Sequence, residues 1–598
     1  MTIHQSMEQG QTASLTALFF AQAARLGERP FVWARLAGRW QPTSWAEAAA
    51  RVTRLAGGLK ALGVEPGDRV ALVSENRPEW ALADLAIMAA GAITVPAYTT
   101  NTVADHLHIL GNSGAKVALC STRVLAERVM AAAWQADRPP VVVAIEPPRL
   151  AQSSGVRLLG WDEVEAMGAG SDTQVAAQVA ATGRGDTACL IYTSGTGGVP
   201  KGVMLSHGAI LSNCAGARAV LAGMGLGDEV FLSFLPLSHS YEHTAGLHFP
   251  ILIGAQIYYA EGVDKLAANL AEVRPTIVTA VPRLYETMRA RILKSVQSAP
   301  AWRKRLFEAA RDFGIARYEG RLAWWQRPAD LVLEFLVRRK IRAGFGGRLK
   351  AFVSGGAPLA FELGLFFTAL GVRILQGYGQ TESAPVVSCN PPGRVKLDTV
   401  GPPMEGVRVR IADDGEILVQ GELVMQGYWR DPDATALALK DGWLHTGDIG
   451  EMDADGYIRI TDRKKDIIVN SGGDNVSPQR VEGFLTLQPE ILQAMVHGDR
   501  RPHLVGLLVP DPDWAQAWAR THGRELGALG DDADFHKALA AAVDRVNRDL
   551  STIEKVRRFT VAAEPFSVAN GMLTPTLKIR RHRIREVYGE MLEGLYSL

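Results

Sequence analysis

Residues 192–202 read Tyr-Thr-Ser-Gly-Thr-Gly-Gly-Val-Pro-Lys-Gly and directly follow the apolar run Ala-Cys-Leu-Ile at 188–191. An apolar run that ends in a cluster of Gly, Ser and Thr predicts a buried strand followed by a tight loop. The hydroxyls of Thr193, Ser194 and Thr196 suit polyphosphate oxygens, and glycine lets the backbone approach a ligand closely. The Lys201 ammonium adds positive charge. The alternative is a surface turn, but such turns rarely combine three hydroxyls, four glycines and a lysine behind a buried strand.

This loop differs from the phosphate loop of the common nucleoside triphosphatases. That loop needs Gly-Lys-Ser or Gly-Lys-Thr, and no Gly-Lys pair occurs in the 598 residues. The sequence therefore predicts a phosphate-binding loop of another kind.

The composition is that of a folded protein with a large core. Hydrophobic residues make up 47% of the chain and charged residues 21%, which is ordinary for globular proteins. Lys and Arg total 64 against 63 Asp and Glu, and this balance argues against nucleic-acid binding.

No targeting or membrane-spanning signal is visible in the sequence. Residues 1–11 are polar, and no stretch approaches the ~20 apolar residues that cross a bilayer. The most apolar candidate, 249–259, is interrupted by Gly254 and Gln256 and is expected to form a core strand with its turn. The four cysteines are widely spaced. We therefore expect a cytoplasmic protein, with peripheral attachment to the inner face of the membrane left open.

Strand-like runs alternate with helical patterns through the first three-quarters of the chain. Helical patterns are expected at 78–90 and 103–110. The strand-like runs are at 69–74, 93–96, 116–120, 230–235, 276–281, 349–354 and 373–376. Repeated strand–helix units predict mostly parallel sheets covered by helices. In such sheets ligands collect at the carboxyl ends of the strands.

The pattern changes after about residue 400. Short strands separated by Asp-Gly turns, at 414–415 and 455–456, predict a small antiparallel β module. A charged run at 463–466 then indicates a domain junction, and the remainder mixes two helical patterns with a strand pair. The expected fold is α/β, with a large domain over 1–464 and a small α+β domain over 465–598.

A second motif, Gln-Gly-Tyr-Gly-Gln-Thr-Glu, occupies residues 376–382 behind a predicted strand. Its two glycines clear space around Tyr378, whose ring suits stacking on a purine. Thr381 is suited to a phosphate, and Glu382 to Mg²⁺ through a hard carboxylate oxygen. A tight turn with a packed tyrosine is the alternative.

These segments resemble the AMP-forming adenylating enzymes, the superfamily of acyl-CoA synthetases, nonribosomal peptide adenylation domains and firefly-type luciferases. Residues 192–202 are similar to its phosphate loop, although Gly197 stands where a second threonine is usual. Residues 376–382 contain its Tyr-Gly-x-Thr-Glu core, and Gly-Trp-Leu-His-Thr-Gly-Asp at 442–448 matches its Trp-x-x-Thr-Gly-Asp. At Gly197 we expect altered loop dynamics or nucleotide affinity rather than lost activity.

The resemblance implies an ATP site. Asp448 would accept hydrogen bonds from the ribose hydroxyls, Arg463 would add a second ribose contact, and residues 354–358 would form a wall of the adenine pocket. Taken alone, Asp448 is more typical of a turn cap. The implied ligand-binding residues are Thr193, Ser194, Gly195, Thr196, Gly197, Lys201, Gly355, Ala357, Gln376, Gly377, Tyr378, Gly379, Asp448, Arg463, Gly472 and Gly473.

The implied catalytic residues are His239, Thr381, Glu382 and Lys578. Residues 571–578 resemble the last motif of the long-chain acyl-CoA synthetases, in which Lys578 would reduce repulsion between a carboxylate and a triphosphate. Residues 234–242 are similar to the segment that places a histidine, here His239, beside the acyl carboxylate. A histidine after an apolar strand is also often a packing residue, and Glu242 is interpreted as structural.

The resemblance also implies a mobile small domain. Lys465 takes the hinge position, where few residues suffice to reorient a domain. The loop at 471–478, with Gly472 and Gly473, is similar to the one that lines the pantetheine tunnel during thioester formation.

Residues 302–350 are rich in arginine and aromatic side chains. Two interpretations stay open: contact with an anionic membrane surface, or amphipathic helices that pack on the large domain. An insertion here is typical of the long-chain branch.

The expected activity has two halves. A long-chain fatty acid reacts with ATP and Mg²⁺ to give acyl-AMP and pyrophosphate, and coenzyme A then displaces AMP to give the acyl-CoA. The alternatives are transfer to a carrier-protein thiol and a non-catalytic nucleotide-binding or lipid-docking protein. Whether the chain is a monomer or a homodimer stays open.

Overall fold

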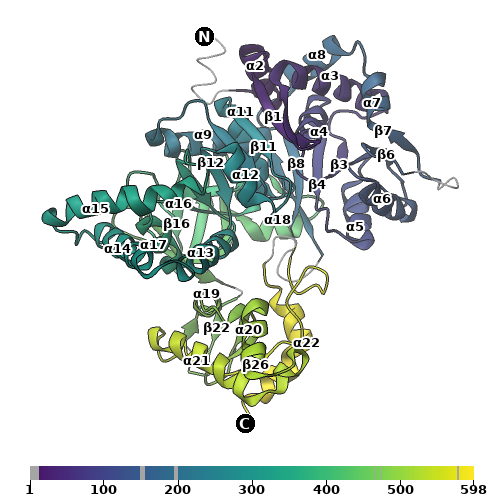
Figure 1. Ribbon diagram of the computed structural model, residues 1–598. Coiled ribbons are helices and arrows are strands. Elements are labelled where there is room, and N and C mark those ends of the chain that lie inside the picture. The colour runs from purple at the N-terminus through teal and green to yellow at the C-terminus, as the bar shows by residue number, and fades with distance from the viewer. Residues whose placement is uncertain are drawn as a thin grey trace.

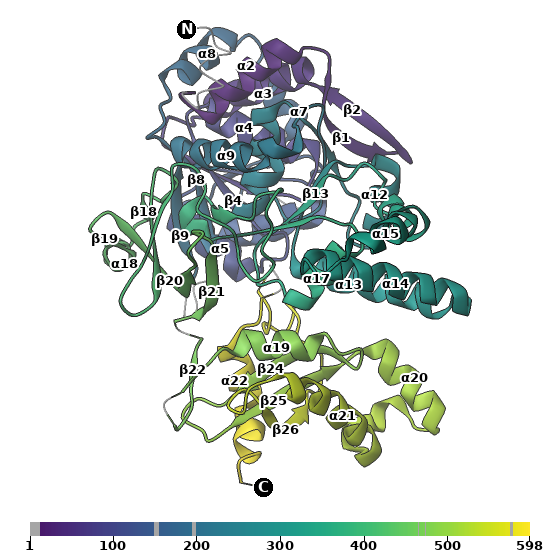
Figure 2. The same ribbon diagram turned by 90° about the vertical axis from the view of Figure 1, so that its left-hand side faces the viewer.

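A computed structural model describes residues 12–148, 155–193, 199–464, 466–472, 474–574 and 578–597 (Figure 1). Within them the chain is α/β, as predicted, with two mostly parallel sheets, an antiparallel module and a smaller α+β part. The core clusters formed after residue 467 contain no described residue from before it. The smaller part lies below the sheets in both views (Figure 2).

The first sheet carries the strand that leads into the predicted phosphate loop. Pairing is parallel except at β8–β9 and β9–β18. In spatial order its strands are β18 (Gly427–Tyr428), β9 (Lys201–Ser206), β8 (Thr187–Thr193), β4 (Ile93–Ala97), β3 (Arg69–Val73), β5 (Val117–Cys120), β6 (Val141–Ala144) and β7 (Leu158–Gly160).

The second sheet carries the strands that lead into the other predicted motifs. It is parallel apart from an antiparallel strand at each edge. In spatial order its strands are β15 (Val386–Cys389), β14 (Ile374–Gly379), β13 (Ala351–Ser354), β12 (Ile277–Ala280), β10 (Val230–Ser233), β11 (Gln256–Tyr259), β1 (Pro30–Leu36) and β2 (Arg39–Ser44).

Helix α4 (Pro78–Ala89) lies between the two sheets. It packs on β3 and β4 of the first sheet and on β1 of the second, and its residues from Trp80 onward are all buried. A helix that is apolar all round is a core helix. The charged Asp84 is therefore part of an interior layer.

Local sequence explains where the helices begin and end. For α5 (Val103–Ser113), Thr102 and Asp105 form a capping box, and Gly114 ends the helix in the left-handed conformation. Further helices of the larger part are α2 (Leu15–Leu26), α3 (Trp45–Ala61), α6 (Arg123–Gln135), α7 (Trp161–Met167), α8 (Asp172–Ala181), α9 (His207–Leu221), α12 (Leu266–Val273), α13 (Pro282–Gln297), α14 (Ala301–Tyr318), α15 (Arg327–Leu333), α16 (Arg339–Ala343), α17 (Phe361–Ala369) and α18 (Pro432–Ala438).

The antiparallel module has the predicted Asp-Gly turns, with Gly415 at φ +83° and Gly456 at φ +80°. Positive φ at these positions is what glycine allows. The strands are β16 (Arg408–Ile411), β17 (Glu416–Gln420), β19 (Leu439–Lys440), β20 (Trp443–Met452) and β21 (Ile458–Arg463).

The part after residue 467 is α+β. Among its described residues a three-stranded sheet forms where the sequence suggested a strand pair. Its main elements are α19 (Pro478–Thr486), β24 (Ile491–His497), β25 (Leu504–Pro510), α20 (Pro512–His522), α21 (Ala533–Asp549), β26 (Val556–Val561) and α22 (Arg581–Gly594).

Residues 249–259 differ from the expected strand with its turn. Phe249–Ile253 forms helix α11, Gly254 ends it at φ +71°, and only β11 is extended. Helix α11 directly continues the π-helix η2 (His243–His248). The first half of the apolar run therefore takes the helical conformation of the residues before it. Among the described residues, no helix is both long and apolar enough to cross a membrane.

Candidate active site

A large cleft of about 3820 Å³ is lined by residues of both parts of the chain. It lies at the carboxyl ends of several parallel strands, as expected for open α/β sheets. The predicted site residues that line it are Thr193, Lys201, His239, Gly355, Ala357, Gln376, Gly377, Tyr378, Gly379, Thr381, Glu382, Asp448, Arg463 and Lys578.

Tyr378, Asp448 and Arg463 form a hydrogen-bonded group on one wall of the cleft. Tyr378 at the end of β14 donates to Asp448 Oδ2 at 2.7 Å, and Arg463 Nε donates to Asp448 Oδ1 at 2.9 Å. Asp448 on β20 faces Arg463 on β21 in the ladder register. Burial, followed by the charge of Asp448, raises the pKa of Tyr378 well above its ordinary value, so the phenol stays a donor.

The 3₁₀ turn η5 (Thr381–Ser383) presents Thr381 and Glu382 to the cleft. Thr381 Oγ1 lies 3.0 Å from Ser240 Oγ, and Glu382 Oε1 accepts a 2.8 Å hydrogen bond from Tyr428. The Tyr428 hydroxyl is thereby held as a donor, since burial and Glu382 both raise its pKa. Glu382 keeps a second carboxylate oxygen for another ligand.

Lys201 extends from β9 directly opposite Thr193 at the end of β8. Its ammonium lies 3.1 Å from Asp431 Oδ2 and 5.4 Å from the centre of the Tyr428 ring. The cation is thus held near the described end of the predicted phosphate loop.

His239 is half-buried and is the N-cap of a short helix, α10 (Ser240–Glu242). Its Nδ1 accepts a 3.1 Å hydrogen bond from the backbone N–H of Tyr241. Burial, with the nearby Lys578 ammonium as the smaller cause, lowers the pKa of His239 to about 3. The imidazole is therefore neutral near pH 7 with its proton on Nε2, where it can donate a hydrogen bond.

Lys578 reaches the cleft from the smaller part of the chain. Its backbone N–H donates to Thr574 Oγ1 at 3.0 Å, and its carbonyl accepts from Thr574 N at 2.8 Å. Enclosure by the cleft walls, then the charge of Arg463, lowers the pKa of Lys578 to about 8, against opposing effects of Asp448 and Glu382. The side chain still exposes surface to the cleft, so we expect water there to moderate this lowering.

Glu242 belongs to the scaffold behind His239. It is fully buried and accepts hydrogen bonds from Ser233 and Thr279, each at 2.6 Å. Burial raises its pKa to about 7. Gly246 is required beside it, because a Cβ there would come within 2.3 Å of Glu242 Oε1.

Other predicted residues do not enter the cleft or are not described. Gly472 is exposed and does not line it. The remaining predicted residues Ser194, Gly195, Thr196, Gly197, Lys465 and Gly473 lie outside the described residues.

The structure adds Tyr428, Asp431 and Ser240, which the sequence analysis did not single out. Tyr428 lies in β18 and Asp431 follows it. This strand pairs with β9, which is far away in the sequence. The available signal was an aromatic pair, Tyr428-Trp429, next to a glycine and before charged residues. Such a pattern does not by itself distinguish a site from an edge strand.

Comparison with known proteins agrees with this geometry. The model of the AMP-binding enzyme family matches residues 19–429, and that of the AMP-binding enzyme C-terminal domain matches residues 465–598. The long-chain-fatty-acid–CoA ligase FadD15 of Mycobacterium bovis is 37% identical over 572 residues, covering 94% of this chain and 93% of its own length. The peroxisomal long chain acyl-CoA synthetase 7 of Arabidopsis thaliana is 30% identical, covering 94% and 82%.

Among solved structures, the A domain of carboxylic acid reductase from Segniliparus rugosus, in complex with AMP and a co-purified carboxylic acid, has the same fold. It superposes with a TM-score of 0.76 at 22% identity, covering 99% of this chain and 96% of that chain. The family models and the relatives that match along nearly the whole chain lead to one conclusion: this protein belongs to the AMP-binding enzyme family.

Proposed function

We propose that this protein is a long-chain fatty acid–CoA ligase that works through an acyl-adenylate. The observation that carries the proposal is the convergence of Lys578, His239 and Asp448 on one cleft from three separate segments. The relatives named as a long-chain-fatty-acid–CoA ligase and a long chain acyl-CoA synthetase support the substrate class.

The nucleotide end of the cleft has the groups that adenosine needs. Tyr378 offers a ring face to adenine, and Asp448 and Arg463 offer an acceptor and a donor to the ribose. Gln376 Oε1 is buried without a hydrogen-bond partner among the described residues, and a buried acceptor of this kind suits the adenine amino group. We infer that Gly355, Ala357, Gly377 and Gly379 complete the pocket wall.

The phosphate end offers hydroxyl groups and the Lys201 ammonium. Thr193, Lys201 and Thr381 line it, and by resemblance Ser194, Gly195, Thr196 and Gly197 belong to the same loop. Glu382 with one oxygen bonded to Tyr428 fits Mg²⁺, which is held in enzymes by one or two carboxylates and the substrate phosphates. Bound Mg²⁺ would neutralise charge on the phosphate oxygens.

In the first half-reaction a carboxylate oxygen of the fatty acid attacks the α-phosphorus, and the bond to the β-phosphate oxygen breaks to release pyrophosphate. Both reactants are anions. The Lys578 ammonium would stabilise the charge that gathers at this centre. Neutral His239 would donate from Nε2 to the acyl carboxylate and hold it in line.

An apolar extension of the cleft suits the acyl chain. Leu284 and Met288 from α13 and Leu359 after β13 line it. Further apolar lining residues are Leu266, Leu270, Ile292, Leu306, Phe307, Val337, Ile341 and Phe345. Burying a long alkyl chain against such a wall is worth ~0.8 kcal/mol per methylene.

We infer that the structure has the arrangement of the first half-reaction, because Lys578 is inside the cleft and Gly472 is outside it. For the second, the part after Lys465 would turn to withdraw Lys578 and bring Gly472 and Gly473 to the cleft. The thiolate of coenzyme A would then attack the acyl carbonyl and expel AMP. A carrier-protein thiol is the alternative acceptor, but the two relatives are named as a CoA ligase and an acyl-CoA synthetase.

Two assays test this function. Exchange of labelled pyrophosphate into ATP that depends on a long-chain fatty acid is expected, and its absence would leave only a binding protein. With free coenzyme A the acyl thioester should form without any carrier protein. Thioester formation on a carrier protein alone would favour the alternative acceptor.

We also propose a cytoplasmic protein with peripheral contact to the inner, anionic face of a membrane. Trp324, Trp325 and Phe335 are 79%, 65% and 62% exposed, and exposed cations Arg327 and Lys340 stand among them. Such a mixture suits an anionic lipid surface. We expect the protein to sediment with phosphatidylglycerol vesicles but not with phosphatidylcholine vesicles. A Trp324→Ala/Trp325→Ala variant should no longer sediment with either. Equal recovery with both lipids would contradict it.

Arg338 in the same segment is not part of that surface. It is fully buried, ion-paired with Asp330 at 2.6 Å, and donates to the carbonyls of Ala310 and Ala369. Part of the basic character of residues 302–350 therefore belongs to helix packing.

A further inference from the structure

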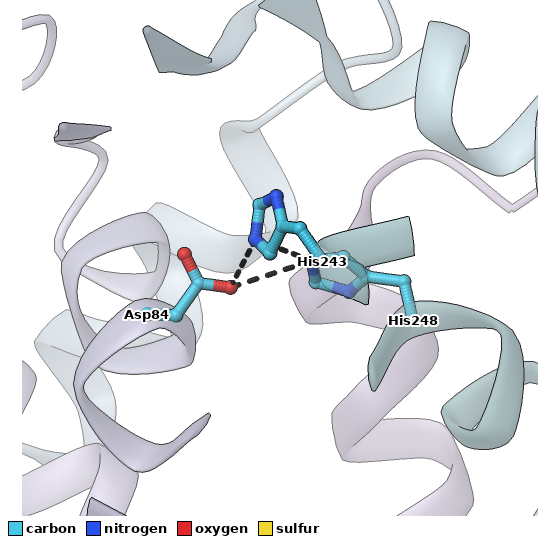
Figure 3. A group of neighbouring side chains, drawn as sticks. All are labelled: Asp84, His243 and His248. Carbon is cyan, nitrogen blue, oxygen red and sulfur yellow. Dashed lines mark hydrogen bonds and ion pairs between the residues drawn. The ribbon is translucent and has the colours of Figure 1, made fainter. Parts of the chain in front are cut away.

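Three titratable side chains, Asp84, His243 and His248, point toward one another (Figure 3). Asp84 comes from α4, and His243 and His248 come from the π-helix η2. Their side chains are 0%, 0% and 1% exposed, and none of them lines the cleft. The proposed function gives this group no role.

The three atoms that face one another have the spacing of metal ligands. Asp84 Oδ2 lies 2.9 Å from His243 Nε2 and 3.3 Å from His248 Nε2, and the two nitrogens are 3.2 Å apart. A tetrahedron with bonds of ~2.0 Å has edges of ~3.3 Å. If both nitrogens carried protons, two N–H groups would be crowded against each other with one carboxylate oxygen to share.

The backbone conformation is what allows both imidazoles to point the same way. Residues five apart in an ordinary α-helix diverge, whereas the wider π-helical turn brings them to one side. The π-helix spans His243–His248, so its ends are the two histidines. Such turns are rare and concentrate at functional sites.

The cluster also has unsatisfied polar atoms. Asp84 Oδ1 and His248 Nδ1 have no hydrogen-bond partner among the described residues. The two histidines are the ion-pair partners that the described residues supply to Asp84. A buried carboxylate without a strong counter-charge is costly, and a bound cation would remove that cost.

We propose that Asp84, His243 and His248 form a structural binding site for a divalent transition metal ion, of which Zn²⁺ fits best. Two imidazole nitrogens and a carboxylate are donors that Zn²⁺ prefers. Asp84 Oδ1 supplies the fourth donor when the carboxylate binds through both oxygens. Cys189 Sγ, 4.0 Å from His243 Nδ1, is an outer contact that orients the ring.

The site has no exposed ligand, so it is a closed structural site rather than a catalytic one. Its role would be to tie α4 to η2. Because η2 directly follows α10, whose N-cap is His239, the ion would fix the segment that carries His239. His243 and His248 are positioning residues in this account, because they act through that segment.

Burial of all three ligands dictates how the ion would behave. It would enter during folding and exchange slowly afterwards. The test therefore uses the untagged full-length protein, expressed in medium supplemented with Zn²⁺, and measures metal content by mass spectrometry. We expect about one zinc per chain that a chelator does not remove from the native protein but that is released in guanidinium.

The matched variants are His248→Gln, His243→Gln and the control His106→Gln. His106 is a buried histidine of α5 outside the cluster. Zinc should be lost from the first two variants and retained by the control. Protein grown with Co²⁺ instead should show the visible absorption bands of a tetrahedral ion, which tests the site in the native chain if a variant fails to fold.

Three results would overturn the proposal. The first is native protein without stoichiometric metal and without cobalt bands, which would leave the cluster as a hydrogen-bonded group of two histidines and a carboxylate. The second is zinc that a chelator strips from the native fold. The third is equal zinc content in folded His248→Gln and wild-type protein. Each can occur while fatty-acid activation is intact, so the proposed function would stand or fall separately.

Discussion

Tyr378 and Asp448 are 70 residues apart in the sequence, and their side chains are joined by a 2.7 Å hydrogen bond. The strand β14 of a parallel sheet supplies the first, and β20 of an antiparallel module supplies the second. Arg463 binds the other carboxylate oxygen of Asp448. This contact joins the end of β14 to the antiparallel module at one wall of the cleft.

Replacing Asp448 by Asn should weaken use of ATP. A hydrogen bond to a charged group is worth ~1.5–3 kcal/mol, so kcat/KM for ATP should fall ~10–100-fold at saturating fatty acid. Asp455→Asn is the control, because Asp455 is exposed and pairs with Lys396 in the same module. Equal losses in the two variants would argue against a ribose contact.

Lys578→Ala should impair the first half-reaction selectively. Loss of one stabilising group at the reacting centre costs ~10²–10³-fold, which pyrophosphate exchange measures. Thioester formation from supplied acyl-AMP should be largely intact. Lys537→Ala, at an exposed lysine of α21, should change neither step. A similar loss in both halves for Lys578→Ala would contradict the assigned role.

The first half-reaction should also depend on the charge of Lys578. Its pKa is lowered to about 8, and the ammonium is charged below that value, so the adenylation rate should fall as pH rises through it. Lys578→Arg should carry the fall to higher pH, because a guanidinium keeps its proton. Single-turnover rates across this range are the measurement. An unchanged profile in the arginine variant would exclude Lys578 as the titrating group.

Glu382→Ala should abolish the Mg²⁺-dependent step at ordinary Mg²⁺. The milder Glu382→Gln variant should need ~10-fold or more Mg²⁺ for half-maximal exchange, because a neutral amide is a weaker ligand for a hard cation. Tyr428→Phe removes only the 2.8 Å hydrogen bond to Glu382, so its Mg²⁺ dependence should shift less. Normal turnover in Glu382→Ala would refute the assignment.

Most of the fold was predictable from local patterns. The runs at 69–74 and 93–96 became β3 and β4 because they are apolar, short and bounded by turns. The Asp-Gly turns marked the antiparallel module. The strand predicted at the start of 249–259 was wrong, because a short apolar segment can form a strand or a helix. Here the segment continues the preceding π-helix.

Site residues that stand close together in one motif could also be predicted, whereas contacts between distant segments could not. Tyr378, Thr381 and Glu382 stand together in the sequence, but their partners Tyr428 and Ser240 are far away in it. The Asp84, His243 and His248 group was missed for the same reason. Two histidines five apart point to one site only when the helix is wound as a π-helix.

The most direct test of the proposed adenylation site is a crystal structure with a non-hydrolysable ATP analogue and a long-chain fatty acid. We expect adenine against Tyr378, ribose at Asp448 and Arg463, and the α-phosphate between Lys578 and the acyl carboxylate. Adenosine bound elsewhere, or a fatty acid that does not reach the α-phosphate, would contradict it.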